Sequence, residues 1–180
     1  MNDIAERSVP NTSDLMEGFE LSGFVPYLLN QAMSQLDNNL RYALKPFSLS
    51  IHQWRVLFML NLRNSVSIGD ISAATVMGQS TITRVADQLE EAGFARRTPM
   101  PSHKRVILLS LTEAGNDLIE EVIPVAFALH DGAVEGFTAE EQQVLFHMLQ
   151  KLATNFRRHE VQQKMNDFTP NTPETHALGG

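Results

Sequence analysis

The 180-residue chain contains no cysteine, which excludes disulfides, thiolate metal sites and cysteine-based redox sensing. No apolar run approaches the roughly 18 residues that a membrane-spanning helix needs. The first residues, 1–7, include acidic side chains and lack an apolar segment, so we expect no signal peptide and a cytoplasmic protein. A content of 43% hydrophobic and 19% charged residues then predicts a globular chain with a core rather than a disordered one.

The sequence also lacks the motifs of common catalytic and cofactor sites. There is no Gly-x-Ser-x-Gly, no phosphate-binding glycine loop and no dinucleotide fingerprint, so we expect neither an enzyme nor a cofactor. The 6 histidines show no His-Glu-x-x-His or other close metal spacing, and no metal site is expected.

The charges are unevenly distributed. With 21 acidic and 14 basic residues the formal net charge is −7, which taken alone argues against a nucleic-acid partner. The segment 94–110 nevertheless holds several basic residues and no acid; they are Arg96, Arg97, Lys104 and Arg105. An acidic body with one basic strip stays soluble and can still place that strip on phosphates.

Apolar residues at helical spacing mark the two ends of the chain. One stripe, expected between Pro26 and Pro46, consists of Leu29, Met33, Leu36, Leu40 and Leu44. A long helix is expected from about Leu111 to Asp131, and a last one follows the capping box Thr138–Glu141. These apolar faces pack either within the chain or against a second copy. We expect the second arrangement, with a dimerisation region over 21–48 and 116–165 and flexible ends at 1–20 and 166–180.

The middle of the chain has the pattern of a helix-turn-helix. A capping box at Ser50 opens one helix, whose expected buried face contains Trp54. A short helix begins after Ser67 and ends near Thr75, and residues 76–78 form a tight connection to a second helix over 79–92. Gly93 stands where a left-handed C-cap is expected. In this motif the second helix enters the major groove by its N-terminal end.

The second helix divides into a core face and a polar face. At 100° per residue the core face consists of Ile82, Val85, Ala86 and Leu89. The groove-facing candidates in the first two turns are Gln79, Ser80, Thr81, Thr83 and Arg84. Hydroxyls and an amide reach phosphates and base edges, and arginine can bind guanine through two hydrogen bonds. The alternative is a merely solvated helix face.

The segment after this helix favours DNA binding. Strands are expected at 94–98 and 106–111 with a turn over 99–104, which makes a hairpin with a basic tip. Lys104 or Arg105 would enter the adjacent minor groove, and Arg96 and Arg97 would contact flanking phosphates. An ordinary surface hairpin is the alternative, but its place directly behind a helix-turn-helix favours a wing. The predicted fold is therefore mainly α with a small β-hairpin wing, and the DNA-binding domain spans 49–115.

Five segments, in this order and spacing, make the chain resemble the MarR family of bacterial regulators from about Tyr27 to Lys151; they are 50–57, 79–85, 89–97, 109–115 and 137–141. The resemblance implies a homodimer with intertwined terminal helices, whose two winged lobes bind a pseudo-palindromic operator as a repressor. It also implies a small aromatic or phenolic effector, for which the sequence assigns no ligand-binding residues.

The wing departs from the family pattern at one position. The family usually has Asp-x-Arg there, whereas this chain has His103, Lys104 and Arg105. Arg105 keeps its place, but His103 replaces the acid that braces it, and His103 becomes a further DNA-binding candidate. The rival hypothesis is a winged-helix module that contacts proteins without reading DNA.

Overall fold

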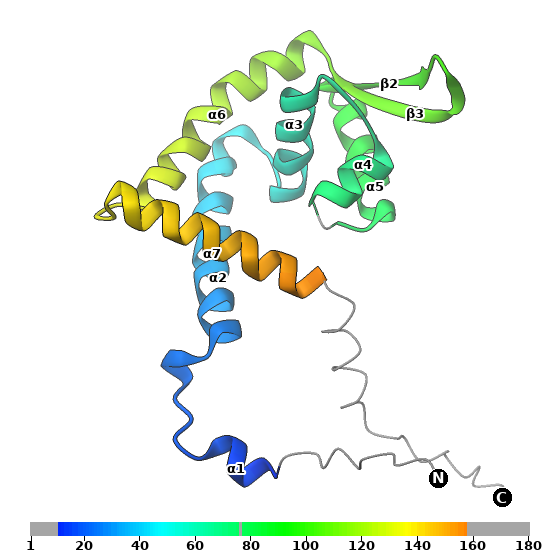
Figure 1. Cartoon of the computed structure of the whole chain (residues 1–180). Helices are drawn as coiled ribbons and strands as arrows, with labels where there is room; N and C mark the ends of the chain where they lie inside the picture. The colour runs from blue at the N-terminus through cyan, green and yellow to red at the C-terminus, as the bar shows by residue number, and fades with distance from the viewer. Residues whose placement is uncertain (1–10, 76, 158–180) are drawn as a thin grey trace, which may run out of the picture. The chain divides into compact units, whose positions relative to one another are not determined.

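The computed structural model describes residues 11–75 and 77–157. Its contacts divide the chain into two units, Met1–His130 and Asp131–Gly180. The helices are α1 Thr12–Met16, η1 Leu21–Gly23, α2 Val25–Leu44, η2 Lys45–Phe47, α3 Ile51–Arg63, α4 Ile68–Thr75, α5 Gln79–Glu91, α6 Glu113–Ala133 and α7 Ala139–Arg157, and the strands are β1 Ser65–Ser67, β2 Ala95–Met100 and β3 His103–Leu111 (Figure 1). The prediction of a mainly helical fold with a small β-hairpin is confirmed. The expectations for 1–10 and 158–180 fall outside the described residues, and α1 lies where no element was predicted.

The predicted helix starts follow from local hydrogen bonds. At α3 the Gln53 backbone N donates to Ser50 Oγ over 3.2 Å, and the Ser50 backbone N donates to Gln53 Oε1 over 2.9 Å, so the capping box is complete. At α2 a proline stands in the first turn, where its missing N–H costs nothing. Both helices therefore begin close to where the sequence placed them.

A three-stranded antiparallel sheet in the order β1-β3-β2 replaces the predicted two-stranded hairpin. Val66 of β1 pairs with Leu109 of β3, and β2 pairs with β3 on the other side. Strand β1 was not predicted, because it has only three residues, of which Val66 alone is buried. So short a strand shows no alternation of apolar and polar residues.

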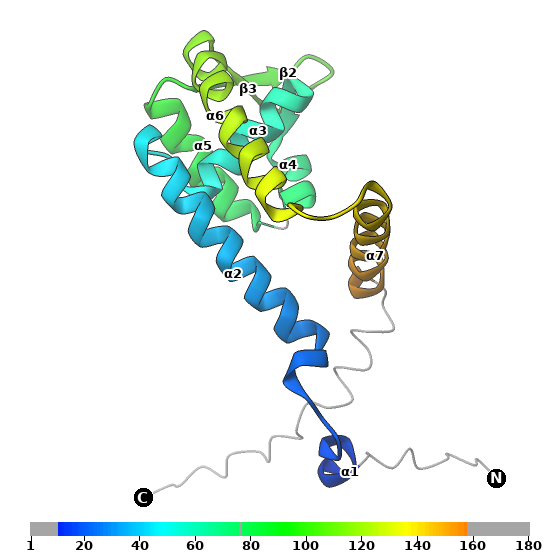
Figure 2. The same cartoon turned by 90° about the vertical axis from the view of Figure 1, so that its left-hand side faces the viewer.

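The core of the first unit lies between α3, α5 and the sheet, with contributions from α2, α4 and α6. Its fully buried large side chains include Leu57 of α3, Ile71 of α4, Leu89 of α5 and Ile119 of α6. The C-terminal half of α2 enters this core through Leu40 and Leu44. The N-terminal half of α2 extends beyond the helices α3 to α5 (Figure 2).

Two helices keep much of their apolar stripe exposed in the single chain. Met33 and Leu36 of α2 are 46% and 40% exposed, although they continue the stripe that buries Leu40. In α7 no residue is buried, and Val144 and Phe156 are 57% and 54% exposed. Contiguous apolar surface of this kind is typical of protein–protein interfaces. Within residues 11–75 and 77–157, no helix is long and apolar enough to cross a membrane.

Candidate nucleic-acid interface

Helices α4 and α5 form the helix-turn-helix that the sequence predicted. At the start of α4 the Asp70 backbone N donates to Ser67 Oγ over 3.1 Å, and the Ser67 hydroxyl donates to Asp70 Oδ2 over 2.7 Å. A hydrogen bond also ties α4 to the connection between α4 and α5: the Ser72 hydroxyl donates to the Met77 carbonyl over 2.6 Å. These bonds fix the short helix and the turn that orient α5.

The N-terminal end of α5 is accessible and has no side-chain cap. Its N-cap residue is Gly78, which has no side chain to accept from the first-turn N–H groups, and the first turn contains no acid. Free N–H groups and the helix dipole attract anions at such an end. The end of α5 is therefore chemically suited to a phosphate.

The predicted division of α5 into two faces is confirmed by burial. Ile82, Val85, Ala86 and Leu89 are at most 2% exposed. Of the groove-facing candidates, Thr81 is half-buried and the rest are exposed; these are Gln79, Ser80, Thr83 and Arg84. The Thr83 hydroxyl donates to the Gln79 carbonyl over 2.9 Å, which leaves its oxygen free to accept.

The C-terminal end of α5 joins the wing and α6 at one junction. Gly93 has φ +77°, the left-handed conformation expected of its C-cap position. The Thr112 hydroxyl donates to the Gly93 carbonyl over 2.6 Å, and the Thr112 backbone N donates to the Phe94 carbonyl over 3.1 Å. A Cβ on Gly115, in the first turn of α6, would lie 2.0 Å from the Phe94 oxygen. Only glycine allows this close approach of α6 to the end of α5, which is the recognition helix of the helix-turn-helix.

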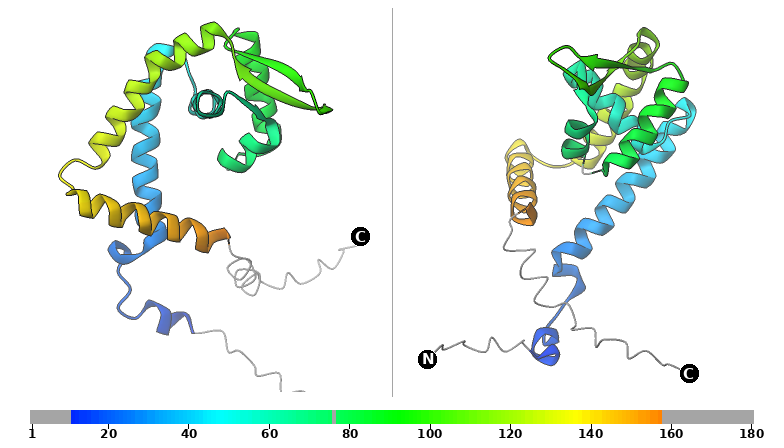
Figure 3. Two further views of the ribbon diagram at one scale, coloured as in Figure 1. Left: turned by 45° about the horizontal axis from the view of Figure 1, so that its top comes forward. Right: turned by 90° about the vertical axis from the view of Figure 1, so that its right-hand side faces the viewer.

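The wing has longer strands and a shorter turn than predicted. The turn expected over 99–104 is wrong, because β2 continues to Met100 and β3 begins at His103. Pro99 pairs with Ile107, which is possible because β2 is an edge strand and needs no N–H donor on its open side. The left view of Figure 3 shows the hairpin projecting from the lobe.

The basic tip lies at an irregularity of this hairpin. The register shifts between Pro99, opposite Ile107, and Met100, opposite His103. The residues of β3 in between include Lys104 and Arg105, which are exposed like His103. The structure thus brings the three predicted tip residues together on the accessible end of the wing.

The two arginines of β2 have different surroundings. Arg96 is exposed, and its Nε donates to Ser110 Oγ over 3.3 Å across the strand pair. Arg97 is half-buried, with 25% of its side chain exposed, and points to α5. One of its terminal nitrogens is 2.6 Å from Asp87 Oδ1, and the other is 2.7 Å from Glu90 Oε2.

The contacts with Asp87 and Glu90 stabilise the positive charge of Arg97. Burial acts to lower the pKa of its guanidinium, but the hydrogen bonds and the negative charges of Asp87 and Glu90 outweigh burial and raise that pKa above its usual value. This pairing of Arg97 with Asp87 and Glu90 was not predicted from the sequence. A signal existed, because Asp87 and Glu90 are three residues apart and therefore lie on one face of α5.

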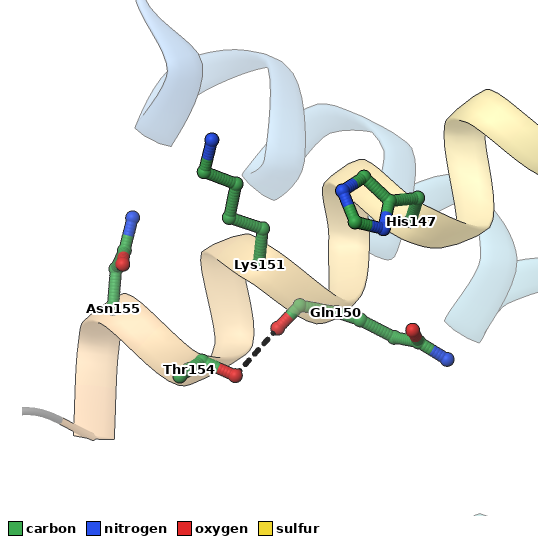
Figure 4. Close-up of a pocket in the computed structure, with 5 residues that line it drawn as sticks. All are labelled: His147, Gln150, Lys151, Thr154 and Asn155. Carbon is green, nitrogen blue, oxygen red and sulfur yellow. Dashed lines mark hydrogen bonds between the residues drawn. The ribbon is translucent and has the colours of Figure 1, made fainter.

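Among the described residues, five of α7 line a depression of the second unit: His147, Gln150, Lys151, Thr154 and Asn155 (Figure 4). The Thr154 hydroxyl donates to the Gln150 carbonyl over 2.9 Å and is thereby used within the helix. Residues 11–75 and 77–157 hold no cluster of three or more histidine and carboxylate side chains suited to a metal ion.

Comparison with known proteins gives consistent matches. A model described as the MarR family matches residues 49–107. The chain is 31% identical to the HTH-type transcriptional repressor IacR of Pseudomonas putida over 137 residues, which are 76% of this chain and 82% of the relative. A solved MarR-family regulator from Silicibacter pomeroyi is 30% identical with a TM-score of 0.71, and the match covers 84% of this chain and 99% of the other. CouR of Rhodococcus jostii, solved with p-coumaroyl-CoA, is 27% identical with a TM-score of 0.70, over 74% and 94% of the two chains.

Proposed function

Because the chain belongs to the MarR family, we propose that it is a bacterial transcription repressor that binds a pseudo-palindromic DNA operator as a homodimer. The observation that carries this proposal is the pairing of two accessible features on one lobe. They are the uncapped N-terminal end of α5 and the basic wing tip, in a chain whose net charge is −7. A regulator of this kind acts by binding rather than catalysis, and it acts in the cytoplasm, where the bacterial chromosome lies.

The proposed contacts divide between the grooves and the DNA backbone. Arg84 and the exposed polar residues of the first turns of α5 read base edges in the major groove; those residues are Gln79, Ser80, Thr81 and Thr83. Lys104 and Arg105 enter the minor groove, with His103 beside them, because the negative potential there favours cations. Arg96 contacts a flanking phosphate.

The dimer and the effector are part of the same proposal. The exposed apolar stripes of α2 and α7 are suited to a second copy, because a single chain leaves them in water. The relative CouR was solved with p-coumaroyl-CoA, which supports a small aromatic or phenolic effector for this chain as well. Such a ligand would lower operator affinity by favouring a conformation in which the lobes do not fit two half-sites.

The test is a binding titration of the purified dimer on duplexes from upstream of its own gene and on random duplexes of equal length. Arg84→Ala is expected to weaken operator binding by about 1–3 kcal/mol and to relax the preference at one base position. Arg63→Ala, at an exposed arginine in the last turn of α3 that has no proposed DNA or dimer contact, is the matched control and should bind like the wild type. Equal losses on operator and random DNA would refute base reading by Arg84, and a wild type without any preferred duplex would refute the proposed function.

A further inference from the structure

We propose that Arg97 is a positioning residue, which fixes the wing to the recognition helix and offsets part of the negative charge of two carboxylates of that helix, instead of binding a phosphate. This inference rests on the proposed function. It changes the role that the sequence predicted for Arg97, which was a phosphate contact like that of Arg96.

The contacts of Arg97 run along one stripe of α5. Its guanidinium donates to the Thr83 carbonyl over 3.3 Å as well as to the carboxylates of Asp87 and Glu90. Positions 83, 87 and 90 follow each other at steps of four and three, so they lie one above the other on the helix surface. One side chain of β2 therefore spans two turns of the recognition helix.

The backbone of β2 is held to the same helix. The Arg97 backbone N donates to Glu90 Oε1 over 3.3 Å, while the side chain of the same residue binds Glu90 Oε2. Glu90 thus holds residue 97 at two points. Met100 is the last residue of β2 and lies at the tip end of the strand, three residues after Arg97. The hydrogen bonds of Arg97 therefore fix the position of the wing tip relative to α5.

The electrostatic role follows from the place of the two acids. Asp87 and Glu90 are on the helix that is proposed to enter the major groove, and their side chains are 60% and 42% exposed. Unpaired carboxylates there would repel the phosphates on both sides of the groove. Arg97 offsets part of this charge. The two terminal nitrogens of its planar guanidinium bind one acid each, an arrangement that the single ammonium nitrogen of a lysine does not reproduce.

Because Arg96 and Arg97 have different partners, replacing each of them by lysine should affect DNA binding differently. Arg96 is exposed and binds only Ser110 Oγ in the described structure, so Arg96→Lys keeps a phosphate contact that needs a point charge. Arg97→Lys keeps the positive charge but loses the planar guanidinium, whose two terminal nitrogens bind Asp87 and Glu90. We expect Arg97→Lys to lower operator affinity about tenfold or more, as for the loss of charge-assisted hydrogen bonds. Its slope of log affinity against log salt should stay unchanged.

The experiment is a salt titration of the full-length dimer on its operator duplex and on a random duplex, with thermal unfolding of every variant alongside. A second variant, Asp87→Asn with Glu90→Gln, removes the partners and leaves Arg97 in place. It is expected to bind random DNA more tightly and to lose several-fold of its operator-to-random ratio, because the freed wing no longer has a fixed position. The Asp87→Asn, Glu90→Gln variant tests the positioning role of Arg97 even if substitutions at Arg97 itself prevent folding.

Two results would overturn the inference while leaving the proposed function intact. One is an Arg97→Lys variant that binds like Arg96→Lys, together with an Arg97→Gln variant whose salt slope falls by about one, as for a lost phosphate contact. The other is an Asp87→Asn, Glu90→Gln variant that gains affinity with an unchanged operator-to-random ratio. A wild type that binds no duplex in the same titration would overturn the proposed function and this inference together.

Discussion

Replacing Gly115 by alanine tests the junction that connects the recognition helix, the wing and α6. The added Cβ would lie 2.0 Å from the Phe94 carbonyl oxygen and 2.9 Å from the carbonyl carbon. Both atoms belong to the backbone, so no flexible side chain can move aside. The oxygen is also the acceptor of the Thr112 backbone N–H, at 3.1 Å, and cannot turn away without losing that bond.

The expected cost follows from the size of this overlap. Relieving it requires a backbone shift of more than an ångström at the first turn of α6, beside the buried side chain of Leu111. Overpacking of a well-packed site typically costs about 1–3 kcal/mol. Alanine is the better helix former by about 1 kcal/mol, which offsets part of the cost. Because the overlap is with backbone atoms, we place the cost in the upper part of that range, at about 2–3 kcal/mol. We therefore expect a net loss of about 1–2 kcal/mol in the free energy of unfolding, and about 2–4 °C in melting temperature for each kcal/mol.

The assay is thermal unfolding followed by circular dichroism, at one protein concentration because the stability of a dimer depends on it. Gly69→Ala in α4 is the matched control, since its Cβ would meet only Ser67 Oγ at 3.7 Å, an ordinary contact. That variant should melt at or slightly above the wild type. A Gly115→Ala variant that is as stable as Gly69→Ala would refute the reasoning, because the close approach would then impose no constraint.

Two further predictions concern the wing tip and the cap of α3. Lys104→Ala should reduce the slope of log affinity against log salt by about one, as for one lost phosphate contact, and an unchanged slope would mean that the tip does not touch DNA in this way. Ser50→Ala removes the acceptor of the Gln53 N–H and should lower the free energy of unfolding by about 1 kcal/mol in urea titration. Ser50→Asp, which can still accept that bond, should stay near the wild type, and a loss equal to that of alanine would argue against the cap.

The features that the sequence predicts well are those decided by neighbouring residues. The start of α3 depends on Ser50 and Gln53, and the end of α5 depends on Gly93, all within one helical turn of the boundary that they set. The core face of α5 is likewise set by spacing along one helix. Such local signals placed the helix-turn-helix, and the basic residues behind it located the wing.

The features that were missed or wrong depend on residues far apart in the sequence. Strand β1 exists because Val66 pairs with Leu109, more than forty positions later. The turn of the wing was placed too wide because Pro99 is a typical turn residue, whereas pairing with β3 keeps it in an edge strand. The partners of Arg97 come from α5, a different element, and no periodicity within β2 indicates them.

The surroundings of Arg97 also change how the charge of this chain is interpreted. The segment 94–110 contains several basic residues and no acid, but not all of these basic residues are free of ion pairs. Arg97 is paired with two carboxylates, whereas Arg96, Lys104 and Arg105 form no ion pair in the described part of the chain. Because counterion release depends on cations that reach phosphates, the proposed wing offers three such arginine and lysine side chains rather than four. An acidic chain can thus bind DNA when its unpaired cations lie at one accessible tip and the acids nearest to it are paired with an arginine.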